Sequence, residues 1–431
     1  MARFSIIFVF LLLKTFTANT QSLYYPPLVG STWQTIDPVS LGWDTTQLAG
    51  LRTFLDTTDT RAFMVLKDGK IVLEYYFNDH NASKPWYWAS AGKSLTSVLV
   101  ACAEADGKLK LTDATSQYLG ANWTSCSTAD EQKITIKNQI TMTSGLDDSS
   151  FDCTEPTCLS CLADAGTRWA YHNSPYTLLD GVIEAATGQD LNAYLKSRLS
   201  DETGINGLYI RSGYNNVFYS TARVMARFGL LVLGNGKWNN KDIIKNPVYV
   251  EEMSKSSQNL NKSYGYLWWL NGKQSFMLPG SQIVFPSSLL PDAPADMFAA
   301  LGKNDQKLYI IPSQNMVILR MGDKGSSDNT LVPIVYDAML WKILNGVFKP
   351  SSSTEIHQRQ NWFVQSSKEI VFENATEIEY VEFMDVSGKI LYATSNGSPV
   401  STSSLPAGLY FIKAQTKQKS ILTSPLLWTG Q

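Results

Sequence analysis

The chemistry that this chain could perform begins with a serine and a lysine three residues apart. Ser90 and Lys93 form the single Ser-x-x-Lys match in the sequence, at the start of an apolar helical pattern. Because residues i and i+3 share one face of a helix, the Lys93 amine can reach the Ser90 hydroxyl. The pair is a candidate nucleophile with a candidate base, although a short motif of two common residue types also arises by chance.

A buried helix is expected to hold this pair in place. Leu95, Val98, Leu99 and Cys102 follow it at helical spacing, and Gly107 marks a helix end. A rigid support of this kind is what a pre-organised nucleophile requires.

Histidine is a poor candidate for the base that would activate Ser90. The three histidines, His80, His172 and His357, lie outside any His-Glu-x-x-His zinc motif. A Gly-x-Ser-x-Gly elbow is excluded as well, because Trp88 stands where its first glycine would be. The base is then expected to be a lysine or a tyrosine whose pKa is lowered by its surroundings.

Tyr171 is the candidate tyrosine. It opens the triplet Tyr-His-Asn at 171–173, directly before an apolar helical pattern. Other Tyr-x-Asn triplets occur at 76–78 and 214–216, so the triplet alone is weak. The alternative is a core tyrosine beside a helix-capping Asn173.

Length and charge restrict the class of partner. The chain has 431 residues, 44% of them hydrophobic, which is enough for two domains with substantial cores. Its net charge of −2 comes from 36 basic and 38 acidic residues without a basic block. Nothing therefore indicates nucleic acid or an anionic membrane surface, and a small molecule is the expected partner.

The N-terminus predicts export. Residues 1–20 combine an early arginine, a short apolar run and a small polar end, which is the layout of a secretory signal peptide. No later run is long and apolar enough to predict a membrane span. We expect a protein that is secreted or held at the cell surface, with the periplasm as an alternative location.

The five cysteines fit an oxidising compartment. Cys102 lies on the apolar face of the Ser90 helix and is expected to be a core thiol. Cys126, Cys153, Cys158 and Cys161 are close in sequence and could form two disulfides, whose pairing stays open. A zinc site made of these four is the alternative.

The order of patterns predicts an α+β domain. A β-hairpin is expected over residues 61–77, around Asp68-Gly69. Residues 109–260 read as an α-rich insertion with helices at 134–140, 177–186, 191–199 and 221–233. Strands at 264–270, 297–302, 307–311 and 316–321 and a helix at 333–344 follow. The first and last parts of residues 21–348 should therefore share one sheet.

The C-terminal region has a different composition. Residues 349–368 contain a Pro-Ser-Ser-Ser-Thr run and are expected to be a linker. Residues 369–431 contain short alternating runs with glycine turns, which predict a small β-sandwich.

Four motifs, in order and spacing, resemble those of the β-lactamase-related serine hydrolases. That family groups class C β-lactamases, D-Ala-D-Ala carboxypeptidases, certain esterases and nylon-oligomer hydrolases. The motifs are Ser-Ala-Gly-Lys at 90–93, Gly-Lys-Leu-Lys-Leu-Thr-Asp at 107–113, the stretch 134–146 and Tyr-His-Asn at 171–173. The likeness covers most of residues 40–345, and residues 220–229 and 264–269 are most similar to the branch of the 6-aminohexanoate-oligomer hydrolases. It implies a serine β-lactamase/PBP-like fold, with an antiparallel sheet flanked by helices.

The resemblance also implies roles for individual residues. Ser90 would be the acylated nucleophile, and Lys93 its proton acceptor or the group that tunes its base. Tyr171 would be the general base that then protonates the leaving group. Asn173 would hold Lys93 and the substrate amide.

The third motif of the family departs from its usual form. Ala300-Leu301-Gly302, followed by Lys303, stands where relatives have Lys-Thr-Gly or His-x-Gly. The backbone amides of Ser90 and Lys303 remain candidates for an oxyanion hole, with Gly302 permitting close approach. The cation that usually binds a substrate carboxylate is missing, which favours an ester or a neutral-flanked amide.

Four tryptophans near the motifs could favour an apolar substrate. Trp86, Trp88, Trp268 and Trp269 would suit an apolar acyl or leaving group, and core packing is the alternative for each.

The C-terminal region resembles the sorting domain of type IX secretion. The similarity lies in its Asp-x-x-Gly-Lys turn at 385–389 and its Leu-x-Ala-Gly-x-Tyr strand at 405–410. It implies a secretion machinery as a second partner, and an adhesive or carbohydrate-binding module is the alternative.

Together these observations predict an exported serine hydrolase that acts on a small ester or amide without a metal or other cofactor. The alternatives are a β-lactamase or D-Ala-D-Ala carboxypeptidase, and a catalytically inactive PBP-like binding protein.

Overall fold

The computed structural model describes residues 23–150, 152–326, 332 and 334–349. In the C-terminal region it describes residues 363–365, 369–372, 375–385, 389–401, 408–418 and 421–428. The expected signal peptide at 1–20 and most of the expected linker at 349–368 lie outside these residues.

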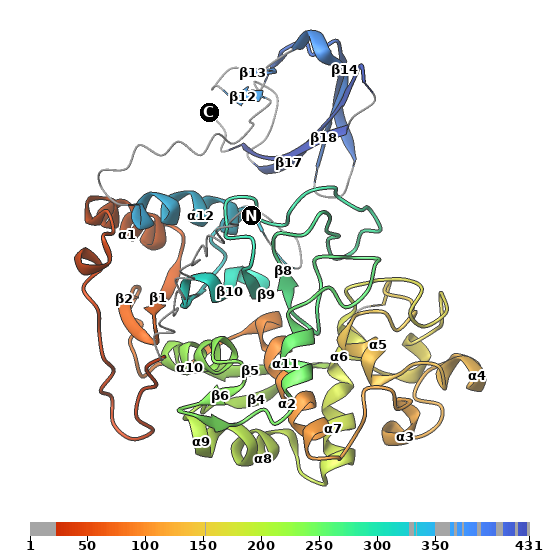
Figure 1. The fold of residues 1–431 in the computed structure, drawn as a ribbon. Helices are drawn as coiled ribbons and strands as arrows, with labels where there is room; N and C mark the ends of the chain where they lie inside the picture. The colour runs from red at the N-terminus through yellow and green to blue at the C-terminus, as the bar shows by residue number, and fades with distance from the viewer. Residues whose placement is uncertain are drawn as a thin grey trace, which may run out of the picture.

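A six-stranded antiparallel sheet forms the centre of the larger part of the molecule, with the order β2-β1-β11-β10-β9-β8 (Figure 1). Its strands are β1 (Thr60–Lys67), β2 (Lys70–Tyr76), β8 (Trp269–Leu270), β9 (Phe298–Gly302), β10 (Gln306–Ile311) and β11 (Met316–Gly322). β1 pairs directly with β11, so the sheet joins the early and late parts of the chain. The prediction of one shared sheet is confirmed.

The β1–β2 hairpin turns at Asp68 and Gly69, as the sequence predicted. Both residues have positive φ, 52° and 83°, which is the backbone geometry of the tightest hairpin turns. A side chain at Gly69 would also collide with the Tyr24 carbonyl, only 1.9 Å from an ideal Cβ.

Helices cover both faces of this sheet (Figure 1). α1 (Leu48–Thr57) and α12 (Val335–Phe348) contact each other on one face, and α2 (Gly92–Ala105) and α10 (Ala222–Leu233) lie on the other. α10 approaches closely because it has Gly229, where a Cβ would lie 2.5 Å from Val317. α2 is buried along nearly its whole length, as expected for a rigid support.

The insertion is mainly helical, as predicted, but it also contains a hairpin that was not predicted. The remaining helices are α3 (Ser116–Leu119), α4 (Thr128–Glu131), α5 (Ile136–Ile140), α6 (Asn173–Thr177), α7 (Leu179–Thr187), α8 (Leu191–Leu195), α9 (Asp201–Thr203) and α11 (Pro247–Met253). The hairpin consists of β4 (Leu208–Ser212) and β5 (Asn215–Ser220), and β5 pairs with β3 (Trp86–Tyr87). A shorter hairpin is formed by β6 (Lys237–Trp238) and β7 (Lys241–Asp242).

The strand predicted at 264–270 is wrong except for Trp269–Leu270. Leu267 has a left-handed backbone with φ of 60°, and Tyr264 bridges back to Trp269. The segment therefore turns on itself before it joins the sheet.

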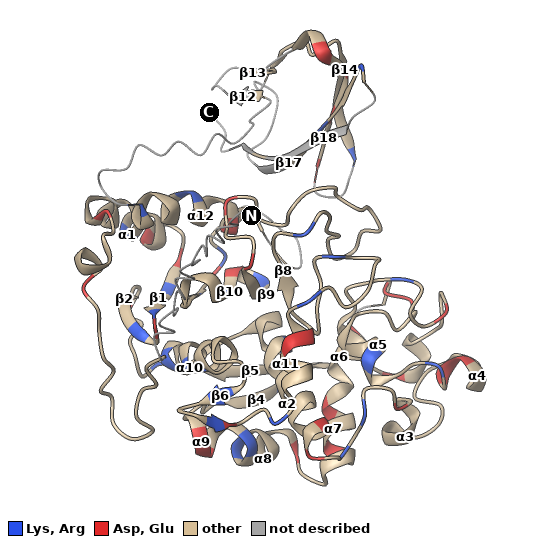
Figure 2. Ribbon diagram, viewed as in Figure 1, with Lys and Arg blue, Asp and Glu red and all other residues tan. Residues whose placement is uncertain are grey.

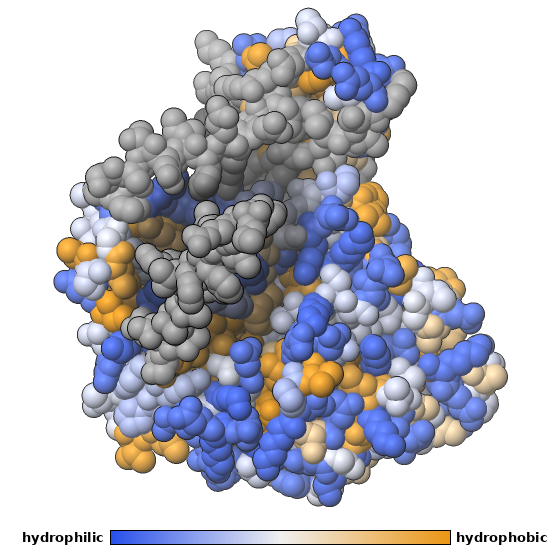
Figure 3. Space-filling model, viewed as in Figure 1, coloured by the Kyte–Doolittle hydropathy of each residue, from blue (hydrophilic) through white to orange (hydrophobic). Residues whose placement is uncertain are grey.

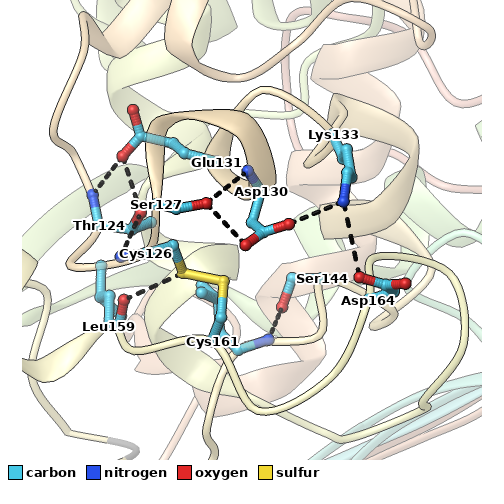
Figure 4. The surroundings of a disulfide bond; sticks show 11 residues. Thr124, Cys126, Ser127, Asp130, Glu131, Lys133, Ser144, Leu159, Cys161 and Asp164 are labelled. Atoms are coloured by element: carbon cyan, nitrogen blue, oxygen red, sulfur yellow. Dashed lines mark hydrogen bonds and ion pairs between the residues drawn. A yellow bond between two sulfur atoms is a disulfide. The ribbon is translucent and has the colours of Figure 1, made fainter.

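Two disulfides hold the loops between α3 and α6. Cys126 pairs with Cys161, and Cys153 pairs with Cys158, which fixes the pairing that the sequence left open. The zinc alternative is wrong because all four thiols are consumed, whereas Cys102 is a buried free thiol as expected. Figure 4 shows the surroundings of Cys126–Cys161, where the Glu131 carboxylate accepts hydrogen bonds from Thr124.

The C-terminal region is an all-β module with two sheets around a small core, consistent with the predicted sandwich. One sheet has β12 (Phe363–Gln365), β13 (Glu369–Phe372) and β16 (Val400–Ser401), and the other has β14 (Ile378–Met384), β15 (Ile390–Ser395), β17 (Gly408–Thr416) and β18 (Ile421–Trp428). The module contacts the larger part through Phe411, whose ring lies 4.3 Å from that of Phe285 and 5.7 Å from that of Phe276.

In the part of the chain that the structure describes, Lys and Arg lie interspersed with Asp and Glu (Figure 2). On the face shown in Figure 3, hydrophobic residues form small patches separated by hydrophilic ones. Within the described ranges, the structure contains no helix with the length and apolar character of a membrane span.

A buried ionic cluster ties α12 to the sheet. Lys307 of β10 forms ion pairs with Asp337 of α12 and with Asp305, and Tyr309 donates to Asp337 over 2.7 Å. The side chains of the ion-paired residues are fully buried.

We predict that Asp337→Ala destabilises the protein by about 3–5 kcal/mol, because it leaves a buried ammonium without its close carboxylate. Chemical denaturation measures the change. Glu251→Ala, which removes a surface pair with Lys255, is the control and should have little effect. Equal stabilities of the two variants would contradict the structural role of the cluster.

Candidate active site

Ser90 lies on a strained turn at the start of α2. It is the middle residue of a 3₁₀ turn, η3 (Ala89–Ala91), and the preceding Ala89 has a left-handed φ of 47°. Such a conformation costs free energy in a residue with a Cβ and persists only where the surroundings impose it. Trp88 provides that constraint: it is fully buried, and its indole donates to Ser220 over 2.8 Å.

Lys93 points back to Ser90 as its position on α2 predicted. Its Nζ donates to Ser90 Oγ over 3.2 Å, and only 3% of the residue is exposed. The ammonium lies 4.0 Å from the centre of the Tyr176 ring and 5.3 Å from that of Tyr171. Burial lowers the pKa of Lys93 to about 7, against an opposing effect of Asp180.

Tyr171 lies near both Ser90 and Lys93. The Ser90 hydroxyl lowers the pKa of the Tyr171 phenol, against the larger effect of burial. The ring stacks on Trp269 at 5.7 Å and meets Tyr264 edge-on, so the phenol is held in an apolar wall. Burial raises the pKa of Tyr171, so the group carries its proton at neutral pH.

Asn173 starts α6 two residues after this tyrosine. Its Nδ2 donates to the Tyr214 hydroxyl over 3.2 Å. Its Oδ1 is buried and has no hydrogen-bond partner in the part of the chain that the structure describes. The hydrogen bond with Lys93 that the family resemblance implied is therefore absent there, and the Oδ1 acceptor is unused.

Gly302, the last residue of β9, brings the sheet against the turn of Ser90. An ideal Cβ on Gly302 would lie 2.6 Å from the Trp88 carbonyl and 3.1 Å from the Ser90 amide nitrogen. Any larger residue would push the strand away, which explains the need for glycine. The Ser90 amide belongs to the first turn of a helix, where amides lack an intrahelical acceptor.

Lys303 follows at the start of the β9–β10 turn, η6 (Lys303–Asp305), and its side chain is exposed. Gln306, which is fully buried, fastens the turn by donating to the carbonyls of Asn304 and Gly322 over 2.9 and 2.6 Å. Asn304 in turn donates to the Tyr87 hydroxyl over 2.8 Å. The backbone amide of Lys303 is thus carried by a rigid turn beside Ser90.

Several contributors to the site were not found from the sequence. Tyr176 contacts Lys93, and its hydroxyl lies 3.3 Å from that of Thr96, which also bonds Tyr209. Asp180 is buried one turn later, bonded by Asn216 over 2.9 Å, and burial raises its pKa to about 7. Their spacing on the helices after Tyr171 was the available signal.

The four tryptophans do not share one environment, as a common apolar subsite would require. Trp88, Trp268 and Trp269 are buried in the core, so packing is their role in this structure. Trp86 is half-buried and lies beneath the Arg61 guanidinium at 5.2 Å.

Comparison with solved structures finds proteins of similar fold. The chain is similar to a 6-aminohexanoate-dimer hydrolase from Bacillus anthracis, with 20% identity, a TM-score of 0.57, and coverage of 76% of this chain and 88% of the other. A family VIII carboxylesterase gives 10% identity, a TM-score of 0.55 and coverage of 73% and 99%. A protein described as a β-lactamase from Bacteroides dorei gives 14% identity and a TM-score of 0.55. The match covers 71% of this chain and 99% of the other.

These structural similarities concern the fold. No curated protein sequence is detectably similar to the chain. The sequence model of the β-lactamase family, in contrast, matches residues 55–328, which is well over half of the chain and includes Ser90, Lys93, Tyr171 and Gly302. The protein therefore belongs to the β-lactamase family.

Proposed function

We propose that the protein is an exported serine hydrolase that cleaves an ester or amide bond of a small molecule through an acyl-enzyme on Ser90. The observation that carries the proposal is the buried Lys93 amine, which lies 3.2 Å from the Ser90 hydroxyl. Burial lowers the pKa of Lys93 to about 7. An amine with this pKa is largely neutral slightly above pH 7 and can accept a proton.

In the proposed acylation step, Lys93 accepts the Ser90 proton while Ser90 Oγ attacks the substrate carbonyl. The Tyr176 ring then stabilises the new ammonium, because the face of an aromatic ring attracts a cation. The amides of Ser90 and Lys303 are proposed to stabilise the oxyanion.

Tyr171 is proposed to donate its proton to the leaving group, since its raised pKa keeps the phenol protonated. Asn173 Oδ1 is proposed to accept a hydrogen bond from the substrate. Water then enters by the same route and releases the acid, with the proton transfers reversed.

The proposed substrate class, an ester or amide, rests on the names of the structural relatives and on the form of the third motif. One relative is described as a 6-aminohexanoate-dimer hydrolase and another as a carboxylesterase. At the position where β-lactam and D-Ala peptide enzymes have a cation, this chain has a buried Ala300. A substrate without a carboxylate at that point is therefore proposed, and a β-lactamase or carboxypeptidase is the alternative.

Export and the C-terminal module complete the proposal. Two disulfides are consistent with an oxidising compartment outside the cytoplasm. Residues 1–20 are proposed to direct export, and residues 369–431 are proposed to act in sorting by a secretion machinery.

The nucleophile can be tested with a chromogenic acetate ester and a cephalosporin. Ser90→Ala should lower kcat/KM at least about 1,000-fold, because it removes the only proposed covalent step. Ser83→Ala, at an exposed serine, is the control and should retain full activity. Intact mass spectrometry should find an acyl adduct on wild type only; turnover by Ser90→Ala would refute the acyl-enzyme.

The role of Lys93 predicts a pH profile. Only the neutral amine accepts a proton, so kcat/KM should fall as the pH drops below about 7. Above its own pKa of about 7, the Asp180 carboxylate favours the Lys93 ammonium, so Asp180→Asn should lower the pKa of Lys93 and move this limb to lower pH. A limb that stays in place or moves upward, in a variant with native stability, would contradict this assignment.

The role of Tyr171 predicts a dependence on the leaving group. Tyr171→Phe should slow an alkyl ester about 100- to 10,000-fold, because an alkoxide needs a proton to depart. The rate with a p-nitrophenyl ester should fall much less, because nitrophenolate departs without accepting a proton. Equal losses for both esters would mean that Tyr171 does not act on the leaving group.

A further inference from the structure

The β4–β5 hairpin has two different faces. Tyr209 and Phe218 are paired on the inner face with rings 4.9 Å apart, and Phe218 packs 3.5 Å from the Cβ position of Gly92 in α2. Side chains alternate along a strand, so the neighbouring residues must point away from α2.

The outer face of this hairpin is apolar and open. We define it as Tyr87, Leu208, Ile210, Val217 and Tyr219, which the strand register places side by side. Leu208 is 57% and Ile210 is 47% exposed, and the other three are half-buried. The remaining strand residues of this face, Ser212 and Asn215, are uncharged.

The β3–β5–β4 sheet contacts residues at or next to the proposed site at two points. At the hairpin tip, the Tyr214 hydroxyl accepts a hydrogen bond from Asn173. At the other end, the Tyr87 hydroxyl accepts one from Asn304, the residue after Lys303. The outer face is therefore continuous with the turn that would hold the carbonyl oxygen of the substrate.

From this continuity we infer that the outer face binds the acyl part of the substrate, and that this part is an uncharged aliphatic chain. The inference rests on the proposed function and adds the substrate class. The carbonyl carbon attacked by Ser90 belongs to the acyl part, and the face begins beside the amide that would hold its oxygen. A charged chain would find no counter-ion among the strand residues of this face, whereas each buried methylene is stabilised by leaving water.

The experiment compares p-nitrophenyl esters from acetate to hexanoate. In wild type, kcat/KM should rise about two- to fourfold for each added methylene. In Leu208→Asn/Ile210→Asn the rise should shrink to less than about 1.5-fold for each methylene, while acetate changes less than about twofold.

Val39→Asn/Val248→Asn is the matched control, because it replaces two apolar residues elsewhere that are 64% and 68% exposed. The control should keep the wild-type rise. Equal rises in all three proteins would overturn the inference, as would a rise that follows the chain length of the alcohol in alkyl acetates. A change of oligomeric mass with an unchanged rise would show that the face binds another copy.

A second measurement separates this inference from the proposed function. Ligand-observed NMR compares the binding of hexanamide and acetamide to the Ser90→Ala variant, which needs no turnover. Tighter binding of hexanamide that depends on Leu208 and Ile210 supports the inference even where no ester is hydrolysed. Equal binding of the two amides overturns it, even where Ser90-dependent hydrolysis is found.

Discussion

The site depends on one costly interaction, a lysine amine buried between two aromatic rings beside a serine hydroxyl. Burial disfavours the ammonium and brings the pKa of Lys93 to about 7, while Asp180 limits how far it falls. The Tyr176 ring, 4.0 Å from the amine, attracts the ammonium form. The amine is therefore neutral enough to accept a proton and is still stabilised after it has done so. Without the buried helix and the Thr96–Tyr176–Tyr209 hydroxyl cluster around it, this balance would not hold.

The second constraint is backbone geometry. The left-handed Ala89 aims Ser90, and Gly302 lets β9 approach the same turn, so neither residue can change without moving the other. The fold places these segments, separated by more than 200 residues, against each other because β9 and α2 pack in one core.

The sequence predicted what depends on local spacing. Ser90, Lys93 and the Asp68-Gly69 hairpin follow from helical and turn geometry, and the shared sheet follows from the order of patterns. The β4–β5 hairpin was missed because its residues carry little apolar alternation and its inner face is decided by contact with α2. For Tyr176 and Asp180 the sequence offered only helical spacing, and their roles follow from contacts with Lys93. Tyr214 became visible only through its tertiary contact, and the disulfide pairing required the folded loop.

The most direct test of this account is the protonation of Lys93 itself. With ¹³C-labelled lysine, the Cε resonance of Lys93, assigned by its absence in Lys93→Arg, can be followed by NMR as the pH is raised. The account predicts a titration midpoint near pH 7. A midpoint near the ordinary lysine value of 10.5 would contradict it, because Lys93 could not then accept the Ser90 proton at neutral pH.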